Sequence, residues 1–409
     1  MTKSSSKKIL TIFTPLLRFF REQSISGFLL IAATIIAIGI ANSSIGDSFI
    51  NFWKSSVTIP LSNHFQFEFT IDQFINDGLM TVFFIVVGLE LKRELIQGEL
   101  SSKEKALLPV IGAIGGMAVP ALIFIFLNYG KSELSGWAIP TATDIAFSLT
   151  VLSLLGNRVP LSLKVFLTAL AVVDDLGAIV IIALFYSHDI HLLYLFYSSL
   201  VVLVLMIMNK KGVKNIYLYL FVGSFLWIFL HHAGIHATIS GVILAMTVPF
   251  RSKDEKEETD ETKIPLNKML HLFSVFSSYF IMPLFALSNA GIKLEYSAMA
   301  ELGSTMSLGI IAGLFLGKPI GITLMTYITT KLKITKIPSE VKWSTIFCVN
   351  ILAGIGFTMS IFVTKLAYTD QRFIETAKFS IIIASFFSGM IGYLVLRFLN
   401  SDKTENVIS

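Results

Sequence analysis

The stretch that decides the fold is LSLKVFLTALAVVDDLGAIVIIALFY, at residues 161–186. It is apolar almost throughout, and at about 1.5 Å per residue a helix of this length reaches across the hydrocarbon core of a bilayer. Two adjacent carboxylates, Asp174 and Asp175, lie at its middle and therefore near the membrane midplane. A charge at that depth costs on the order of 3 kcal/mol. Two such charges indicate an ion or proton site rather than a structural role.

The composition indicates a membrane protein with many spans. Of its 409 residues, 54% are hydrophobic and 14% are charged, and the mean hydropathy is +0.75. Ordinary soluble domains have about 25% charged residues. Cys348 is the one cysteine, which excludes a disulfide framework and a cysteine-based metal site. The net charge of +5 is spread between apolar segments, so we interpret it as membrane topology and expect no nucleic-acid partner.

The apolar runs predict an all-α polytopic membrane protein that forms a single transporter domain over residues 1–409. About twelve spans are expected. They lie at 25–43, 73–92, 106–128, 135–155, 161–186, 190–209, 214–231, 234–250, 266–290, 303–327, 341–366 and 374–399. An even number of spans places both termini on the same side of the membrane.

Lysine and arginine predict which side that is. One set of alternate loops is rich in these residues, whereas the other set holds only Lys54, Lys131, Lys293, Lys365, Arg372 and Lys378. The positive-inside rule then places both termini in the cytoplasm. It makes residues 1–24 an amphipathic cytoplasmic segment, 251–264 a cytoplasmic linker and 400–409 a cytoplasmic tail.

Residues 44–70 form neither an apolar span nor a charged loop. Phe65, Phe67 and Phe69 alternate with polar residues, and Ser62-Asn63 is a suitable turn. We predict a small external β-hairpin over this range.

Two of the predicted spans are interrupted by helix-weakening residues. One holds AIPTATD at 138–144, with Pro140 and Asp144, and the other holds GIGFTMS at 354–360. Unwound backbone inside a membrane is tolerated only where protein or water covers it. Interruptions in corresponding places of two halves indicate a transport site, where Asp144 would face the positive ends of the half-helices. A simple proline kink is the alternative.

Lys318 is the only lysine that we place within a span, and its position alone leaves two interpretations open. It could snorkel to the interface or neutralise an acid at the midplane. Asp174 and Asp175 point about 100° apart on a helix, so one can face an ion path and the other a protein partner. Burial and a neighbouring carboxylate both disfavour the charged form, so we expect the two acids to exchange protons as a coupled pair.

Several long motifs resemble those of NhaA-type sodium/proton antiporters. They are WAIPTATDIAFSLTVLSLLGNRVP, FLTALAVVDDLGAIVIIALFY, GIHATISGV, MPLFALSNAG, GKPIGI and GIGFTMSIF. The resemblance implies inverted repeats, two broken and crossing helices, a midplane site and no cofactor. It also implies a protein of the bacterial cytoplasmic membrane that serves pH homeostasis and dimerises through the external hairpin.

The same resemblance implies roles for individual residues. The matching ion and proton residues are Asp174, Asp175, Thr143, Asp144 and Lys318, with Asp174, Asp175 and Thr143 as the Na⁺ ligands. Glu90 and Glu94 match an acidic cluster at the cytoplasmic funnel that is linked to the pH response, and His236 matches the histidine of the GIHAT motif. From the residues alone these would be an interfacial charge cluster and a buried histidine.

His271 matches a further pH-response histidine, and here the chain departs from the family. Many members carry an acid directly before this histidine, whereas this chain has Leu270. The departure leaves the shape of the pH profile open.

We therefore expect a secondary antiporter, not an enzyme, which exports cytoplasmic Na⁺ or Li⁺ in exchange for protons and is electrogenic and pH-regulated. There is no Walker-type loop to indicate nucleotide use. The alternatives are an exchanger with a different cation preference, a membrane sensor and an intramembrane aspartyl protease. A sensor would not need two broken helices, and the protease would need aspartates from different helices in a Gly-x-Gly-Asp context.

Overall fold

The computed structural model describes residues 25–62, 65–187, 189–250, 264–294, 301–337 and 341–399. The predicted N-terminal segment 1–24, the tail 400–409 and all of the linker except Ile264 lie outside the described residues.

Long apolar helices make up most of the described chain. Seven of them are long and apolar enough to cross a membrane. Four are single α-helices: α5 (Lys103–Asn128), α7 (Leu161–Phe185), α8 (Leu192–Lys210) and α18 (Gln371–Leu399). Three contain a π-helical turn: α3–η1–α4 (Ile71–Gln73, Phe74–Leu79, Met80–Gln97), α11–η5–α12 (Pro265–Phe276, Ser277–Ile281, Met282–Asn289) and α14–η7–α15 (Thr305–Ala312, Gly313–Gly317, Lys318–Lys331). The all-α polytopic membrane fold is confirmed.

Three further helix pairs are bent at a short break. They are Ile25–Ala41 with α2 (Gly46–Lys54) at 115°, η2 (Ser132–Thr141) with α6 (Ile145–Leu154) at 43°, and α16 (Trp343–Ala353) with α17 (Phe357–Ala367) at 49°. Counting each pair as one span brings the described residues to ten candidate spans at most. The two interruptions predicted at 138–144 and 354–360 coincide with the second and third breaks.

Two of the predicted spans are shorter than their apolar runs. α9 (Ile216–His232) has 17 residues, and α10 (Ile239–Thr247) has 9. The chain between them, at 233–238, forms turns instead of a helix. The helix expected over 234–250 therefore starts later than the apolar pattern predicts.

A two-stranded sheet follows α2. β1 (Ser56–Ser62) pairs with β2 (Phe65–Thr70) in antiparallel fashion. The hairpin prediction over 44–70 is wrong for its first part, because residues 46–54 are helical. Phe49 and Trp53 lie one helical turn apart and pack against the main core. Asp47 in the first turn and Lys54 in the last suit the helix dipole.

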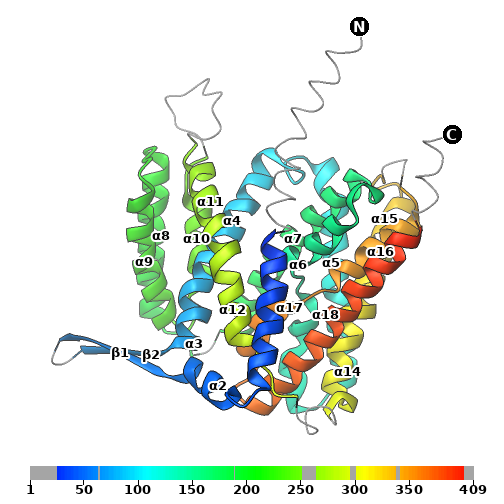
Figure 1. Cartoon of the computed structure of the whole chain (residues 1–409). Helices are drawn as coiled ribbons and strands as arrows, with labels where there is room; N and C mark the ends of the chain where they lie inside the picture. Colours follow the sequence, from blue (N-terminus) through cyan, green and yellow to red (C-terminus); the bar gives the residue numbers. More distant parts are fainter. Residues whose placement is uncertain are drawn as a thin grey trace.

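The buried apolar side chains form two clusters with α4 between them. The larger cluster draws on α5, α7 and α14–α18, and the smaller one on α8–α11. Figure 1 shows α8–α11 together on one side of α4, with α14–α18 on the other. α4 supplies Phe84, Val87 and Leu91 to the larger cluster and Val86 and Leu89 to the smaller one. It is thus the boundary between two helix groups.

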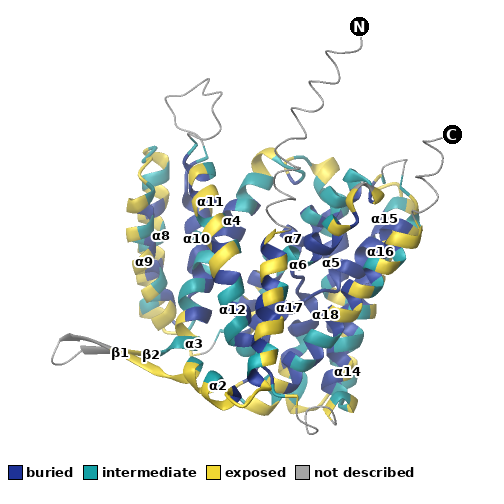
Figure 2. Cartoon of the chain, in the orientation of Figure 1, coloured by how far each residue is buried: buried dark blue, intermediate teal, exposed yellow. Residues whose placement is uncertain are grey.

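Large apolar side chains also cover the outside of the protein. Phe126, Leu184, Leu192 and Tyr217 are each more than 70% exposed. Figure 2 shows exposed residues along α8 and α9, whereas buried residues gather where α5, α7 and α16 meet. Outward-facing apolar side chains suit lipid contact, and the buried centre holds the polar residues described next.

Candidate functional site

The two broken spans meet through their backbones. The N–H of Asp144 donates to the carbonyl of Ile355 at 2.7 Å, and the Thr143 hydroxyl donates to the carbonyl of Ala353 at 3.0 Å. These carbonyls belong to the end of α16 and the break after it, where no further helical turn can pair them. The first interruption therefore supplies the hydrogen-bond donors, and the second supplies the carbonyl acceptors that its own helix leaves unpaired.

Asp144 lies between two helix N-termini. It is the N-cap of α6, where its carboxylate accepts the N–H of Phe147 at 2.9 Å. Its other oxygen accepts the N–H and the hydroxyl of Thr358, at the start of α17, at 3.1 and 2.5 Å. Helix N-termini carry positive partial charge and unpaired N–H groups, so both helices stabilise one carboxylate that is 1% exposed.

Lys318 joins the first broken span to α7. Its ammonium lies 2.5 Å from Oδ2 of Asp174, with side-chain exposures of 0% and 1%, and it also donates to the hydroxyl oxygen of Thr143. The hydroxyl can accept this bond because its own proton goes to Ala353. The ammonium is held inside the protein, so the snorkelling interpretation of Lys318 is wrong.

Asp175 faces a small cavity instead of a lysine. The cavity has a volume of about 50 Å³ and is also lined by Asp144, Thr358 and Glu90. That volume holds a few waters or a small ion without a full hydration shell, since one water needs roughly 10–15 Å³. Within the described residues, Oδ1 of Asp174 and Oδ1 of Asp175 are buried without a hydrogen-bond partner. The two neighbouring acids therefore differ: one is paired to an ammonium, and the other is presented to a cavity.

The predicted pH-response residues do not form one cluster. Glu90 lines the Asp175 cavity. Glu94 lies one turn further along α4 and accepts the N–H of Glu99 at 2.9 Å, which stabilises the turn after the helix. His271 is exposed on α11. His236 precedes α10 at the opposite end of α4, because α10 runs parallel to α4, with Gly241 beside Thr81 and Ala245 beside Gly88.

Sequence reasoning missed Thr358 and three serines. Thr358 could have been found, because it is the first hydroxyl after the glycines of the second interruption. Ser274, Ser277 and Ser278 line the Asp175 cavity from α11 and η5. Their spacing of three and four residues places them on one helix face, although one face of serines does not by itself predict a cavity.

The sequence prediction also misplaced two lysines near the end of the bundle opposite Glu90. Lys365 lies in α17 and Lys378 in α18, with Lys378 only 9% exposed. Neither is a loop residue, so Lys318 is not the only lysine within a span. The helices continue through these positions because the ammonium groups have polar surroundings that the sequence does not reveal.

Two tyrosines outside the spans hold the first half of the broken span η2. The Tyr186 hydroxyl donates to the carbonyl of Ser135 at 2.8 Å, and the Tyr368 hydroxyl donates to that of Glu133 at 2.6 Å. Burial raises the pKa of both tyrosines above its ordinary value. They therefore remain hydrogen-bond donors throughout the physiological pH range.

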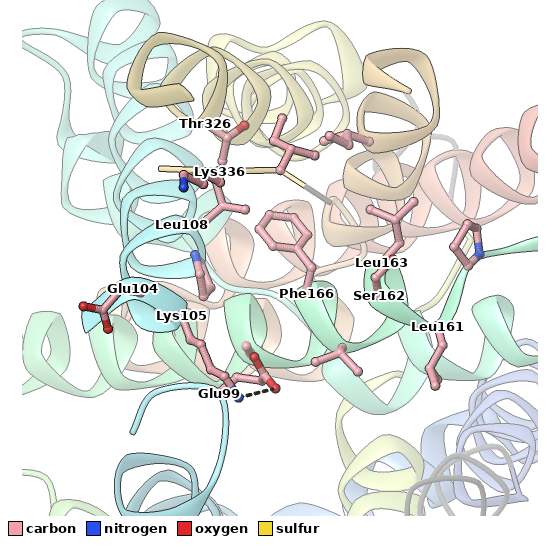
Figure 3. Close-up of a pocket in the computed structure, with 16 residues that line it drawn as sticks. Glu99, Glu104, Lys105, Leu108, Leu161, Ser162, Leu163, Phe166, Thr326 and Lys336 are labelled. Atoms are coloured by element: carbon pink, nitrogen blue, oxygen red, sulfur yellow. Dashed lines mark ion pairs between the residues drawn. The ribbon is translucent and has the colours of Figure 1, made fainter. Parts of the chain in front are cut away.

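A larger cavity lies away from the aspartates. It has a volume of about 650 Å³ and is lined by the beginnings of α5 and α7, by α15 and α16 and by Lys336 and Ile337. In Figure 3, Phe166 points into it between Leu108 and Leu163. Lys105 and Glu99, 3.7 Å apart, pair beside it. It holds none of the predicted site residues, so the small Asp175 cavity is the candidate ion site.

Known proteins resemble the chain over nearly its whole length. A family model described as Na+/H+ antiporter 1 matches residues 17–396. The Na(+)/H(+) antiporter NhaA of Cytophaga hutchinsonii is 47% identical over 391 residues, which cover 96% of this chain and 97% of that protein. The Na(+)/H(+) antiporter NhaA of Pelagibacter ubique is 46% identical over 382 residues, covering 93% and 96%.

Proposed function

Since this chain belongs to the Na+/H+ antiporter 1 family, and is a membrane transporter that exchanges Na⁺ for protons and not an enzyme, we propose the residues at which the exchange takes place. They are Asp174, Asp175, Thr143, Asp144 and Lys318. Na⁺, and Li⁺ as its smaller congener, would bind to Asp174, Asp175 and Thr143.

The contrast between Asp174 and Asp175 carries this proposal. Asp175 lines the cavity, and its Oδ1 has no hydrogen-bond partner among the described residues, so it can take up either a cation or a proton. Asp174 is neutralised by Lys318 at 2.5 Å. When Na⁺ approaches both acids, its charge substitutes for that of the ammonium. The oxygen of Thr143 that now accepts from Lys318 would then become available to the ion.

Asp144 has a different part in this proposal. Its carboxylate is saturated by Phe147 and Thr358, so it holds the two half-helix N-termini together and does not serve as a first ligand. Its charge also favours a cation in the cavity that it shares with Asp175. This negative potential attracts Na⁺ and protons alike.

We further propose twelve spans, inverted repeats and cytoplasmic termini in the bacterial cytoplasmic membrane. α9 and α10 would complete the count, and the lysine-rich loops support the orientation. Glu90 would then lie on the cytoplasmic side of the site. Cytoplasmic Na⁺ would leave as protons enter, more protons than Na⁺ per cycle, which makes transport electrogenic.

The pH response is assigned to Glu90 first. Glu90 shares the cavity with Asp175, so its charge acts on the ion directly. Glu94, His236 and His271 would act through helix position, since they lie outside that cavity. We also propose a homodimer in which β1 and β2 supply the contact, because a two-stranded sheet leaves both edges free to pair with a second copy.

The decisive experiment measures cation-driven proton movement in everted vesicles. Asp174→Asn and Asp175→Asn should each abolish it at normal protein level, while Asp189→Asn should not. Asp189 is exposed and has a φ of 45°, a conformation that asparagine adopts as readily. Robust exchange in either site variant would refute the assignment. Adding Na⁺, Li⁺ and K⁺ separately identifies the preferred cation.

A further inference from the structure

An ion pair joins two spans at the end of the bundle opposite Glu90. The Lys365 ammonium lies 2.6 Å from both carboxylate oxygens of Asp72. The two side chains are 17% and 30% exposed, and 293 residues separate them in the chain. Lys365 is at the end of α17, and Asp72 is in the first turn of α3.

Hydrogen bonds extend this contact to a third span. The Asn76 amide donates to the backbone carbonyl of Asp72 at 2.6 Å and to its carboxylate at 2.9 Å. The Asn289 amide, at the end of α12, donates to Asn76 at 3.3 Å. Asn76 is 8% exposed and Asn289 is fully buried. The network thus ties α17, η1 and α12 together.

An aromatic layer separates this network from the ion site. Phe84 of α4 and Phe362 of α17 are each 1% exposed, and their ring centroids lie 5.4 Å apart. Phe362 is one helical turn after Thr358, and Lys365 follows in the next turn. Asp72 and Glu90 belong to one span and are about 27 Å apart along it. The order along the bundle is therefore acidic cavity, aromatic layer, ion pair.

A second cavity reaches the ion pair from the far side. Its volume is about 530 Å³, and Asp72 and Lys365 line it together with Lys54, Glu375 and Lys378. The Asp175 cavity, on the near side of the aromatic layer, contains none of these residues. One cavity is therefore lined by the acidic residues of the ion site and the other by the ion pair, with Phe84 and Phe362 between these two levels along α4 and α17.

We propose that the Asp72–Lys365 ion pair is a positioning contact that closes the ion path on the side opposite Glu90. It holds the C-terminal end of α17 on α3, while Thr358 at the N-terminal end of α17 contacts Asp144. Opening that side requires α17 to separate from α3, which breaks the pair and parts Phe84 from Phe362. The pair therefore favours the state in which the ion site faces Glu90.

The inference rests on the proposed ion site and makes a separate prediction about the apparent KM for Na⁺ on each side of the membrane. A contact present in one access state alone changes the ratio of the two states when it is removed. Lys365→Met and Asp72→Asn should raise the apparent KM for Na⁺ on the Glu90 side and lower it on the opposite side. We expect the ratio of the two KM values to change by about fivefold or more.

The experiment compares everted and right-side-out vesicles that hold the same variant. Asp47→Asn is the matched control, because Asp47 pairs with Lys293 at 2.5 Å beside the same cavity but involves no residue of α17. It should leave the KM ratio unchanged. The charge-exchanged variant Asp72→Lys/Lys365→Asp should move the ratio back toward that of the wild type.

Three results would overturn the inference. They are an unchanged KM ratio in the single variants, equal shifts of both KM values, and the same ratio change in Asp47→Asn. Thermal unfolding in detergent identifies variants that fail to fold. If a single variant fails to fold, the charge-exchanged variant, which keeps both charges at this contact, still tests the inference. If the wild type itself shows no Na⁺-driven exchange, the proposed function fails instead.

Discussion

Both the hydroxyl and the backbone N–H of Thr358 donate to a single carboxylate oxygen of Asp144, at 2.5 and 3.1 Å. The two residues belong to different broken spans and lie 214 positions apart in the chain. The negative charge of one interruption thus meets the helix N-terminus of the other. Neither half-site would be stable in a membrane alone, so the breaks are mutually dependent.

Thr358→Val tests this dependence. Valine keeps the shape but removes the hydroxyl, leaving the buried Asp144 carboxylate one hydrogen bond short. We expect a stability loss on the order of 2 kcal/mol and slower transport. Thermal unfolding in detergent and vesicle exchange measure the two effects. Thr358→Ser, which keeps the hydroxyl, is the control. Equal behaviour of valine and serine would show that the backbone N–H suffices.

Lys318→Ala separates stability from transport. Removing the ammonium leaves the Asp174 carboxylate buried and unpaired, which costs about 3 kcal/mol or more. The double variant Asp174→Asn/Lys318→Met removes both charges, so we expect it to regain most of the melting temperature while exchange stays absent. A single alanine variant with unchanged melting and transport would mean that the ion pair has no role.

Competition between Na⁺ and protons predicts the pH dependence. Raising the pH removes protons from the acids, so the apparent KM for Na⁺ should fall until they are fully ionised. Glu90→Gln removes a charge from the Asp175 cavity and should shift this fall without abolishing exchange. The measurement is apparent KM across mildly acidic to alkaline pH without imposed voltage. A flat KM with a sharply rising maximal rate would instead indicate a dedicated gate.

Gly354→Ala tests the close approach at the second break. A Cβ atom there would lie less than 3.0 Å from the carbonyl oxygen of Leu314. Because backbone must then move, we expect a loss of about 2 kcal/mol in stability and a large loss of transport. Gly39→Ala is the control, since nothing lies within 4 Å of the position that its methyl group would take, and alanine there should be neutral or stabilising. Equal melting temperatures for both variants would contradict the expected clash.

The sequence was most informative where membrane physics is strict. Asp174 and Asp175 are costly at the midplane, so they could be recognised without a structure. Pro140 and the glycines at 354–356 predicted where the helices break, because few residue types interrupt a span. The side-chain partners of Asp144 and Lys318 could not be predicted from spacing, since they depend on how the two breaks meet.

The sequence was least informative at the ends of the spans. α2 was missed because its helical pattern, in which Phe49 and Trp53 lie one turn apart, covers too few residues. It could not be distinguished from the strand-like alternation that follows it. Lys365 and Lys378 look like loop residues in sequence, since a lysine marks a boundary unless its partner is known. The partner Asp72 is 293 positions away, and no local pattern connects them.

The close packing of α4 on α10 limits how the two helix groups can shift. A Cβ on Gly88 would lie 2.7 Å from that of Ala245, and one on Gly241 would lie less than 3.0 Å from the carbonyl oxygen of Thr81. Helices that touch at backbone level cannot slide past each other, so we expect α4 and α10 to move together as one rigid unit. The shear plane then falls on the opposite face of α4, where Phe84 meets α17. Spin-label distances across the α4–α10 contact should stay constant during the cycle, while those from α4 to α17 should change.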